Sequence, residues 1–347
     1  MTEPLISARP RIRLDGESRA DMNAAVRDCS IRLPLSGMAH CELRLINWGG
    51  RADNPDADFV FNDIAPGQAI EILMGEDAEE PVFSGDITAI EERYGDGAPQ
   101  LVLLAEDRLH LLARLRANRA HEETSIGDVI SQLAQEANLQ ADAQLDTQGT
   151  WHQLNESHLA FILRLAAPYD IAVRLQDGQL RARPEEEDSE PVALHAQDNV
   201  QRIRIVADLN QQPLSAQTRG YDIGADQATE HDAGSLTPAP RGSTAADKLN
   251  QLGWGSDEIH PQPYPVSQGE AEGWAKGWLH RKAKRFLHGE ITTSGIPALR
   301  SGREIELDGV SPRLQGRYQV VDCQHRFDSS GYRTVIKVQR ADLGDDA

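Results

Sequence analysis

The chain has 347 residues, of which 39% are hydrophobic and 26% are charged, and its formal net charge is −20. This length and composition are typical of a folded protein with two or three domains, and exclude a chain disordered throughout. The acidic charge repels nucleic-acid phosphates, which argues against sequence-specific binding of nucleic acid. It fits either an ordinary solubilising surface or an acidic lumen along which anionic cargo slides.

The sequence contains neither a membrane-spanning segment nor a recognisable secretory signal. No apolar run approaches the roughly 18 residues that cross a bilayer, and the N-terminal MTEPLISARPRIRL lacks an apolar segment after its charges. We therefore expect no stable membrane insertion, and we expect the chain to be made and folded in a cytoplasm. The three cysteines, Cys29, Cys41 and Cys323, are far apart and odd in number, which predicts buried free thiols rather than a disulfide or metal site.

The first third of the chain has the pattern of short β-strands. Gly85 interrupts one of them, as glycine often does at a bulge or a barrel corner. Turn-forming residues separate the segments, which indicates a small antiparallel barrel, and we assign the first β-barrel domain to residues 1–118. The predicted strands are RIRL at 11–14, HCELRLI at 40–46, AIEIL at 69–73, PVFSGDITAI at 81–90 and LVLLA at 101–105.

The following residues, 119–190, form a predicted α+β module. Apolar residues from Ile126 to Ala137 recur on one helical face, and Ser125 is the expected N-cap. A second helix is predicted after Asn155 and ends before Pro168. Asp177-Gly178 between two alternating runs predicts a β-hairpin.

The last part of the chain combines a second strand-rich region with an insertion. Residues 191–221 and 288–341 predict a second β-barrel, closed by a hairpin turn at 328–331. Residues 222–287 are an excursion in which 222–246 lack periodicity and predict a long loop, followed by an amphipathic helix over about 269–287. Residues 342–347 are a C-terminal tail. The predicted fold is therefore α+β and mainly β, with two similar antiparallel barrels and the helical module and the excursion between them.

Motifs for catalysis are missing from the sequence. It has no HExxH, GxSxG, GxxxxGK[ST] or CxxC pattern, and His280, His288 and Glu290 have no metal-pair spacing. The acidic run from Glu185 to Asp188 is typical of a solvated linker. We expect no enzyme, and no catalytic, cofactor-binding or metal-binding residues. A cell-wall hydrolase with two carboxylates in a cleft remains the alternative from another class of protein.

Several segments together resemble the phage late control protein D family, whose members are hubs of contractile tails and whose domain also begins type VI secretion spike proteins. The segments are PVFSG at 81–85, EDRL at 106–109, SIGDVI at 125–130 and LNESHLAFI at 154–162, with Leu154 and His158 where the family usually has Gln and Asp. Tyr221 replaces a common Trp. The signature residues are Phe83, Gly85, Asp107, Glu156, Ser157, Phe161, Gly289, Gly302, Tyr318, His325, Gly331 and Tyr332.

The resemblance implies a structural baseplate hub of a contractile phage tail or a related injection particle. It implies a homotrimer of pseudo-sixfold shape that adapts a hexameric tail tube to a trimeric spike. The implied partners are the tail tube or a tube-initiator protein, a separate spike protein and baseplate wedge proteins. The implied site of assembly is the bacterial cytoplasm, and the implied mature location is the virion tail baseplate or the injection particle. Because the chain ends at Ala347, no fused spike domain is expected, and Arg340, Asp342 and Leu343 are expected to face the spike. The alternatives are a tail-associated peptidoglycan hydrolase and an effector-carrying spike component of a contractile injection system.

Overall fold

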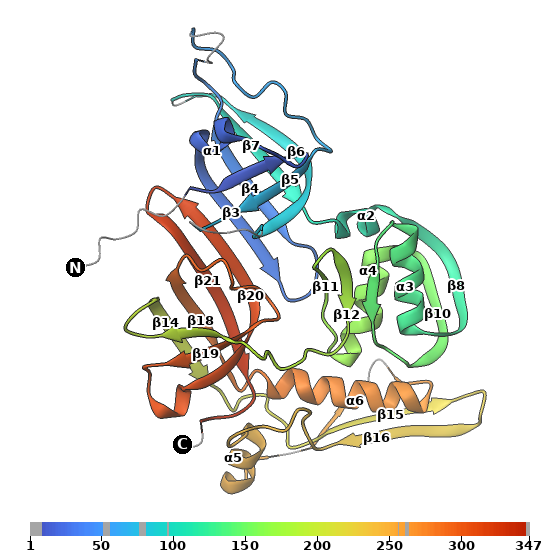
Figure 1. Ribbon diagram of the computed structural model, residues 1–347. Helices are drawn as coiled ribbons and strands as arrows, with labels where there is room; N and C mark the ends of the chain where they lie inside the picture. The colour runs from blue at the N-terminus through green and yellow to red at the C-terminus, as the bar shows by residue number, and fades with distance from the viewer. Residues whose placement is uncertain are drawn as a thin grey trace.

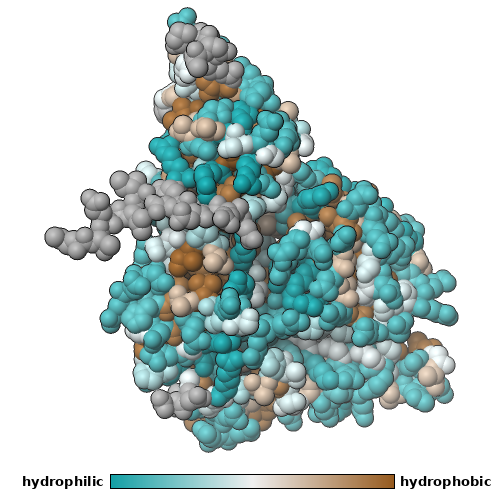
Figure 2. Space-filling view, viewed as in Figure 1, coloured by the Kyte–Doolittle hydropathy of each residue, from teal (hydrophilic) through white to brown (hydrophobic). Residues whose placement is uncertain are grey.

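The computed structural model describes residues 9–50, 56–75, 81–95, 97–255, 257–260 and 264–344. Strands predominate, and helices lie mainly in two inserted parts (Figure 1). The predicted α+β, mainly β fold is thereby confirmed. In the described residues no helix has both the length and the apolarity needed to cross a bilayer. Figure 2 shows a mainly hydrophilic face, as expected for a strongly acidic chain, with smaller hydrophobic clusters over the two β lobes.

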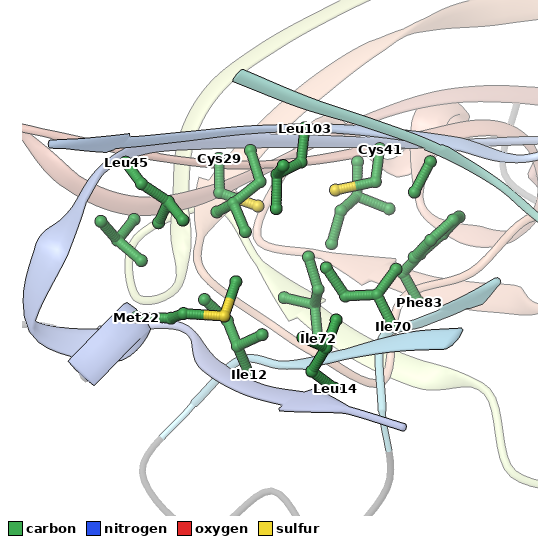
Figure 3. Packing of buried hydrophobic residues seen from close by; sticks show 14 of the residues in the cluster. Ile12, Leu14, Met22, Cys29, Cys41, Leu45, Ile70, Ile72, Phe83 and Leu103 are labelled. Carbon is green, nitrogen blue, oxygen red and sulfur yellow. The ribbon is translucent and has the colours of Figure 1, made fainter. Parts of the chain in front are cut away.

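The first β lobe packs its strands around one hydrophobic cluster. Figure 3 shows Cys41 and Leu45 of β4 pointing into the core toward Ile12 of β1, Ile72 of β5 and Met22 of α1. Alternation of apolar and polar residues buries one face of each strand, as the sequence predicted. All three cysteines are free and buried, which confirms the prediction for them. The elements are β1 (Arg11–Leu14), β2 (Glu17–Ser18), α1 (Ala20–Ala25), β3 (Val26–Pro34), β4 (His40–Ile46), β5 (Ala69–Leu73), β6 (Phe83–Arg93) and β7 (Gln100–Glu106).

The helical module lies beside the lobes and has its own core. The Ser125 hydroxyl accepts a hydrogen bond from the Asp128 amide at 3.0 Å, so the predicted N-cap is confirmed. The second helix begins at His158, and its N-cap is Ser157. The hairpin at Asp177-Gly178 is also confirmed. The elements are α2 (Leu109–Arg114), β8 (Arg116–Ser125), α3 (Ile126–Glu136), β9 (Ala141–Ala143), β10 (Gln148–Ser157), α4 (His158–Ala166), η1 (Ala167–Tyr169), β11 (Val173–Gln176) and β12 (Gln179–Ala182).

The second β lobe has a separate core that includes Leu287, Ile291, Ile305, Val320 and Ile336. Its last two strands form the hairpin that the sequence predicted at 328–331. Its elements are β13 (Val192–His195), β14 (Val200–Ala207), β18 (Leu287–Ser294), β19 (Glu304–Asp308), η2 (Pro312–Leu314), β20 (Gly316–Asp328) and β21 (Gly331–Arg340).

The insertion between β14 and β18 is more ordered than the sequence predicted. The expected long loop at 222–246 is wrong, because this stretch contains the turn and the second strand of a β-hairpin and the start of a helix. Its strands carry few apolar residues and are held instead by two buried threonines. The Thr218 hydroxyl donates to the Ala271 carbonyl at 2.7 Å, and the Thr229 hydroxyl donates to the Pro265 carbonyl at 2.8 Å. The elements are β15 (Ala216–Asp222), β16 (Gln227–Ala233), α5 (Ala245–Leu252), β17 (Glu258–His260) and α6 (Gln268–Ala283).

The predicted amphipathic helix corresponds to α6, which packs on the β15–β16 hairpin with Ala275 and Leu279 (Figure 1). It ends at Ala283 rather than near Leu287, because Leu287 is the first residue of β18 and belongs to the core of the second lobe.

The two β lobes belong to one continuous sheet. Its strands are paired in the order β14-β18-β21-β20-β3-β4-β7-β6-β5-β1-β2, and β19 adds to β20 and carries β13. In the described residues this path does not close on itself, so the two expected β-barrels are open lobes of one sheet. The reason is that β3 of the first lobe pairs with β20 of the second, which joins the lobes edge to edge.

Candidate assembly surface

Apart from the two-residue strand β2, each lobe contains six strands in the same topological order. In chain order, the strands of the first lobe are β1, β3, β4, β5, β6 and β7. The corresponding strands of the second lobe are β13, β14, β18, β19, β20 and β21. The first lobe is paired as β3-β4-β7-β6-β5-β1 and the second as β14-β18-β21-β20-β19-β13. Position by position these two orders are the same. The last pairing differs in direction, since β5–β1 is antiparallel and β19–β13 is parallel.

The pairing registers of the two lobes also coincide. The hairpin β6–β7 pairs Asp86 with Glu106, and its counterpart β20–β21 pairs Gln319 with Gln339. A register shift follows at the same place in both hairpins, between Ile87 and Ala89 in the first lobe and between Val320 and Asp322 in the second. Bulges are specific features of a fold. A repeat that extends to them indicates two equivalent units within one chain.

The first strand pairs share a second bulge. The β3–β4 pair shifts between Val26 and Asp28, and the β14–β18 pair shifts between Val200 and Arg202. After the shift Cys29 lies opposite Leu43 in the first lobe, and Ile203 lies opposite Ile291 in the second. Strands β3 and β14 are therefore equivalent residue by residue, with Val26 corresponding to Val200.

The junction between the lobes is the antiparallel pairing of β3 with the C-terminal half of β20. It runs from Asp322 opposite Pro34 to Phe327 opposite Cys29. The guanidinium of Arg32 bonds the carboxylate of Asp322 at 2.6 Å. Strand β20 therefore uses its N-terminal half for β19 and its C-terminal half for β3.

Side chains of the β18–β19 connection lock the junction. Arg300 donates to the carbonyls of Val82 at 2.9 Å and Pro81 at 2.7 Å, both at the start of β6. The Ser301 hydroxyl donates to the carbonyl of Leu33 in β3. These contacts tie the second lobe to two strands of the first, so the two lobes are held in one fixed arrangement. No local pattern predicts these contacts, because each joins residues more than two hundred positions apart.

One edge of each lobe has no strand partner in the described part of the chain. Strand β14 ends the sheet and pairs with β18 alone. Strand β6 pairs with β5 as far as Asp86, and from Ala89 to Arg93 it pairs with β7 alone. These two edges are the equivalents of the two strands that form the junction. Free edges offer unpaired amides and carbonyls to another chain.

The signature glycines lie where a side chain has no room or where the backbone needs a positive φ. A Cβ on Gly85 would overlap the carbonyl oxygen of Glu106, and one on Gly289 would overlap the carbonyl oxygen of Arg204. Gly302 and Gly331 have φ of 88° and 99°, which glycine adopts at little cost. These four residues shape the strands and turns of the two lobes.

His325 lies at the centre of a buried polar cluster in the second lobe. Its Nε2 lies 3.0 Å from the carbonyl oxygen of Leu299, and its Nδ1 lies 2.7 Å from the Tyr332 hydroxyl. The carbonyl can only accept, so Nε2 carries the proton and Nδ1 accepts from Tyr332. Burial lowers the pKa of His325 to about 3, so the ring is neutral at pH 7. The Cys323 thiol also donates to Leu299.

The remaining signature residues of the first lobe and the module are local supports. Phe83 and Phe161 are buried in the two respective cores. The carboxylate of Asp107 accepts from the amides of Ala39 and Leu109 at 2.8 and 2.9 Å, and burial raises its pKa to about 6. Glu156 pairs with Arg164 at 2.6 Å, beside the N-cap residue Ser157.

The three tail residues lie against the segment that precedes α5. Asp342 accepts hydrogen bonds from the amides of Arg241 and Gly242 at 2.5 and 3.0 Å, and pairs with Arg340 at 2.5 Å. The amide of Leu343 donates to the Ser243 carbonyl at 2.9 Å. Arg340 also lies 5.4 Å from the ring of the buried signature residue Tyr318. Residues 345–347 of the predicted tail lie outside the described residues.

A charged cluster that sequence analysis missed lies under the module. Glu185 accepts from Arg174 at 2.5 Å and from Arg181 at 2.8 Å, and all three side chains are largely buried. The sequence suggested only a solvated acidic linker here. This cluster borders an open cavity of about 840 Å³ between the module, the insertion and the second lobe. Among the described residues no group of three metal-ligating side chains was found.

Three solved structures of tail-related proteins share this fold. The 43 kDa tail protein of prophage MuSo2 from Shewanella oneidensis has a TM-score of 0.70 at 14% identity, over 96% of this chain and 99% of that one. A tail protein from Neisseria meningitidis has a TM-score of 0.67 at 13% identity, over 96% of each chain. A component of the E. coli type VI secretion system has a TM-score of 0.59 at 11% identity, over 91% of this chain and 73% of that one.

These likenesses confirm the predicted tail-protein fold. No curated protein matched the chain in the same set of comparisons. A family model described as the Alg8 N-terminal domain matches residues 11–329, which is most of the chain. The matching model is not that of late control protein D. By this match the chain belongs to the family described as the Alg8 N-terminal domain.

Proposed function

We propose that the chain is the structural hub of a contractile tail baseplate, or of a related injection particle, and that it acts as a homotrimer. The observation that carries this proposal is the repeat of one six-strand lobe within a single chain, identical in strand order and in bulge positions. The fold shared with tail proteins and with a type VI secretion component supports it. The more specific assignment to the late control protein D family belongs to the same proposal.

The physical argument concerns symmetry. Three copies of a chain with two equivalent lobes present six lobes around one axis, while the chain as a whole repeats only three times. Such a ring matches a sixfold tube on one side and a threefold spike on the other. The proposed partners are therefore a tail tube or tube-initiator protein, a separate spike protein and baseplate wedge proteins.

The parts of the chain receive distinct roles in this proposal. The first lobe, within residues 1–118, and the second lobe, within 191–221 and 288–341, build the ring. The module at 119–190 and the excursion at 222–287 lie outside it, and the tail at 342–347 faces the spike with Arg340, Asp342 and Leu343. Signature residues such as Gly85 and His325 act as structural supports, not in catalysis.

The test is the mass of the purified chain in solution, measured by sedimentation over a range of concentrations. A hub sediments as three 38.2 kDa chains. A monomer at all concentrations contradicts the proposal, as does a preparation that clears a suspension of purified cell wall, since that activity is expected of the hydrolase alternative.

A further inference from the structure

We propose that the free edge of β14 pairs, in an antiparallel ladder, with the free half of β6 of a second copy of this chain. The register is the one that β3 and β20 use inside each chain. This inference rests on the proposed homotrimer and adds which strands meet, in which direction and which residues lie opposite each other. Figure 1 shows β6 in the upper lobe and β14 at the outer side of the lower lobe, so the two edges do not meet within one chain.

The equivalence of the lobes fixes the register without adjustable choice. Strand β3 corresponds to β14 and strand β20 corresponds to β6, so each pair of the internal junction predicts one pair of the external junction. Asp322 opposite Pro34 predicts Ala89 opposite Asp208. The following predicted pairs are Ile90 with Ala207, Glu91 with Val206, Glu92 with Ile205, Arg93 with Arg204 and Tyr94 with Ile203 of the second copy.

On one face of the proposed ladder Arg93 and Arg204 lie opposite each other, and Glu91 lies diagonal to Arg204. In the internal junction the Gln324 amide donates to the Ser30 hydroxyl at 3.0 Å, across a diagonal. The equivalent residues at the external junction are Glu91 and Arg204. A neutral hydrogen bond inside the chain therefore corresponds to an opposite-charge pair between chains.

Arg204 is available for this contact. It is exposed, and its side chain makes no ion pair or hydrogen bond with the described residues. Glu91 is exposed as well and pairs with its neighbour Arg93 at 2.8 Å. On the β6 edge Glu91 and Glu92 outnumber Arg93, and in β14 Arg202 and Arg204 are both basic, so the two free edges carry opposite net charge.

The other face of the ladder buries apolar side chains. Ile203 and Ile205 are half-buried and pack on the core of the second lobe, while Ile90 is half-buried on the core of the first. Tyr94 is 63% exposed and lies edge-on to Phe59 at 6.1 Å. Pairing as proposed places Ile203 beside Tyr94 and Ala207 beside Ile90, with Glu92 opposite Ile205 between these two apolar contacts.

The proposed pairing uses up both edges in a closed ring. Each lobe pairs one edge with the lobe before it and the other edge with the lobe after it. Around the ring, junctions within a chain alternate with junctions between chains. A head-to-tail contact closes into a ring when its rotation allows and otherwise grows into a filament. If the junction between chains repeats the junction within a chain, each lobe is rotated by the same angle relative to the lobe before it. This one angle then sets both the closure of the ring and the number of chains in it.

Paired cysteines test the register. We would compare two in-register variants, Arg93→Cys with Arg204→Cys and Glu92→Cys with Ile205→Cys, in the full-length chain. Neighbouring antiparallel pairs alternate between narrow and wide spacing, so one of the two variants suits a disulfide. The native cysteines are buried and do not compete. Mild oxidation is expected to give covalent dimers and trimers, with the trimer as the largest species on a non-reducing gel.

The matched controls recombine the same four substitutions out of register, as Arg93→Cys with Ile205→Cys and Glu92→Cys with Arg204→Cys. A shift of one residue puts the two thiols on opposite faces of the sheet, so these controls are expected to stay unlinked. Equal or stronger linkage in the controls overturns the inference. So does a trimer by sedimentation in which neither in-register variant links, and that result leaves the proposed hub standing.

Charge exchange tests the diagonal pair. Glu91→Arg places a second arginine beside Arg93 against Arg204, and is expected to raise the dissociation constant of each contact about 3- to 10-fold. Adding Arg204→Glu is expected to restore association. Glu230→Arg, at an exposed glutamate of β16 away from both edges, is the matched control and should leave association unchanged. Failure of the double variant to recover contradicts the Glu91–Arg204 contact. Monomeric wild-type chain at every concentration contradicts the proposed function itself.

Discussion

Acidification is expected to destabilise the second lobe through His325. Its side chain is completely buried, with its Nε2 proton donated to Leu299 and its Nδ1 accepting from Tyr332. Burial lowers the pKa of the ring to about 3 from an ordinary 6.5, and the nearby charge of Arg300 acts in the same direction. A proton added to Nδ1 would reverse this bond, so that the ring donates to the Tyr332 hydroxyl, and would place an unpaired positive charge in the core near Arg300.

The sign and size of the effect follow from proton linkage. Below pH 6.5 the unfolded chain binds a proton at this histidine and the folded chain does not, so stability is full above pH 6.5 and falls as pH falls toward 3. A difference of one bound proton changes the free energy of unfolding by about 1.4 kcal/mol per pH unit, so His325 alone lowers this free energy by about 2 kcal/mol at pH 5. Asp107 acts oppositely, because its pKa is raised to about 6 and its protonation favours the folded chain as pH falls from 6 toward 4.

The measurement therefore compares the wild-type chain with His325→Gln at pH 7 and pH 5, which cancels the contribution of Asp107. Glutamine keeps a donor for the Leu299 carbonyl and does not titrate. Urea unfolding followed by circular dichroism is expected to show that wild type loses about 2 kcal/mol more than the variant between these pH values. Equal losses in the two chains refute the reasoning, as does an NMR signal of His325 that titrates between pH 7 and 5.

Three further substitutions test the supports described above. Gly85→Ala forces a methyl group against the Glu106 carbonyl and is expected to cost about 1–3 kcal/mol of unfolding free energy, whereas exposed Ser84→Ala should be near neutral by urea unfolding. Phe161→Ala, fully buried in the module, is expected to cost about 3–5 kcal/mol, and a cost below 1 kcal/mol would contradict its place in that core. Glu185→Gln leaves two largely buried arginines without their carboxylate and is expected to lower the thermal midpoint, an effect that Glu186→Gln on the exposed linker should not reproduce.

Local signals in the sequence were sufficient for most elements. The N-cap at Ser125 and the hairpin at Asp177-Gly178 depend on residues a few positions apart, and both were predicted correctly. The hairpin of β15 and β16 was missed, because its strands are polar and depend on Thr218 and Thr229 bonding to a later part of the chain. Hydrophobic periodicity reveals a strand only where apolar and polar residues alternate.

The candidate assembly surface could be predicted only in part. The resemblance pointed to residues such as Gly85 and His325, and the structure places them in separate supports rather than in one site. The junction of β3 with β20 was not predictable, since it pairs residues such as Arg32 and Asp322 that lie far apart in the chain. The free edges of β6 and β14 became visible only once this junction was known, because they are its equivalents.

The most direct test of the repeated-lobe account is electron microscopy of the purified oligomer viewed along its axis. The account predicts a ring with threefold symmetry and six similar lobes, in which the inserted modules appear three times on the outside. A twofold particle, an open filament or a ring with only three β lobes would contradict it.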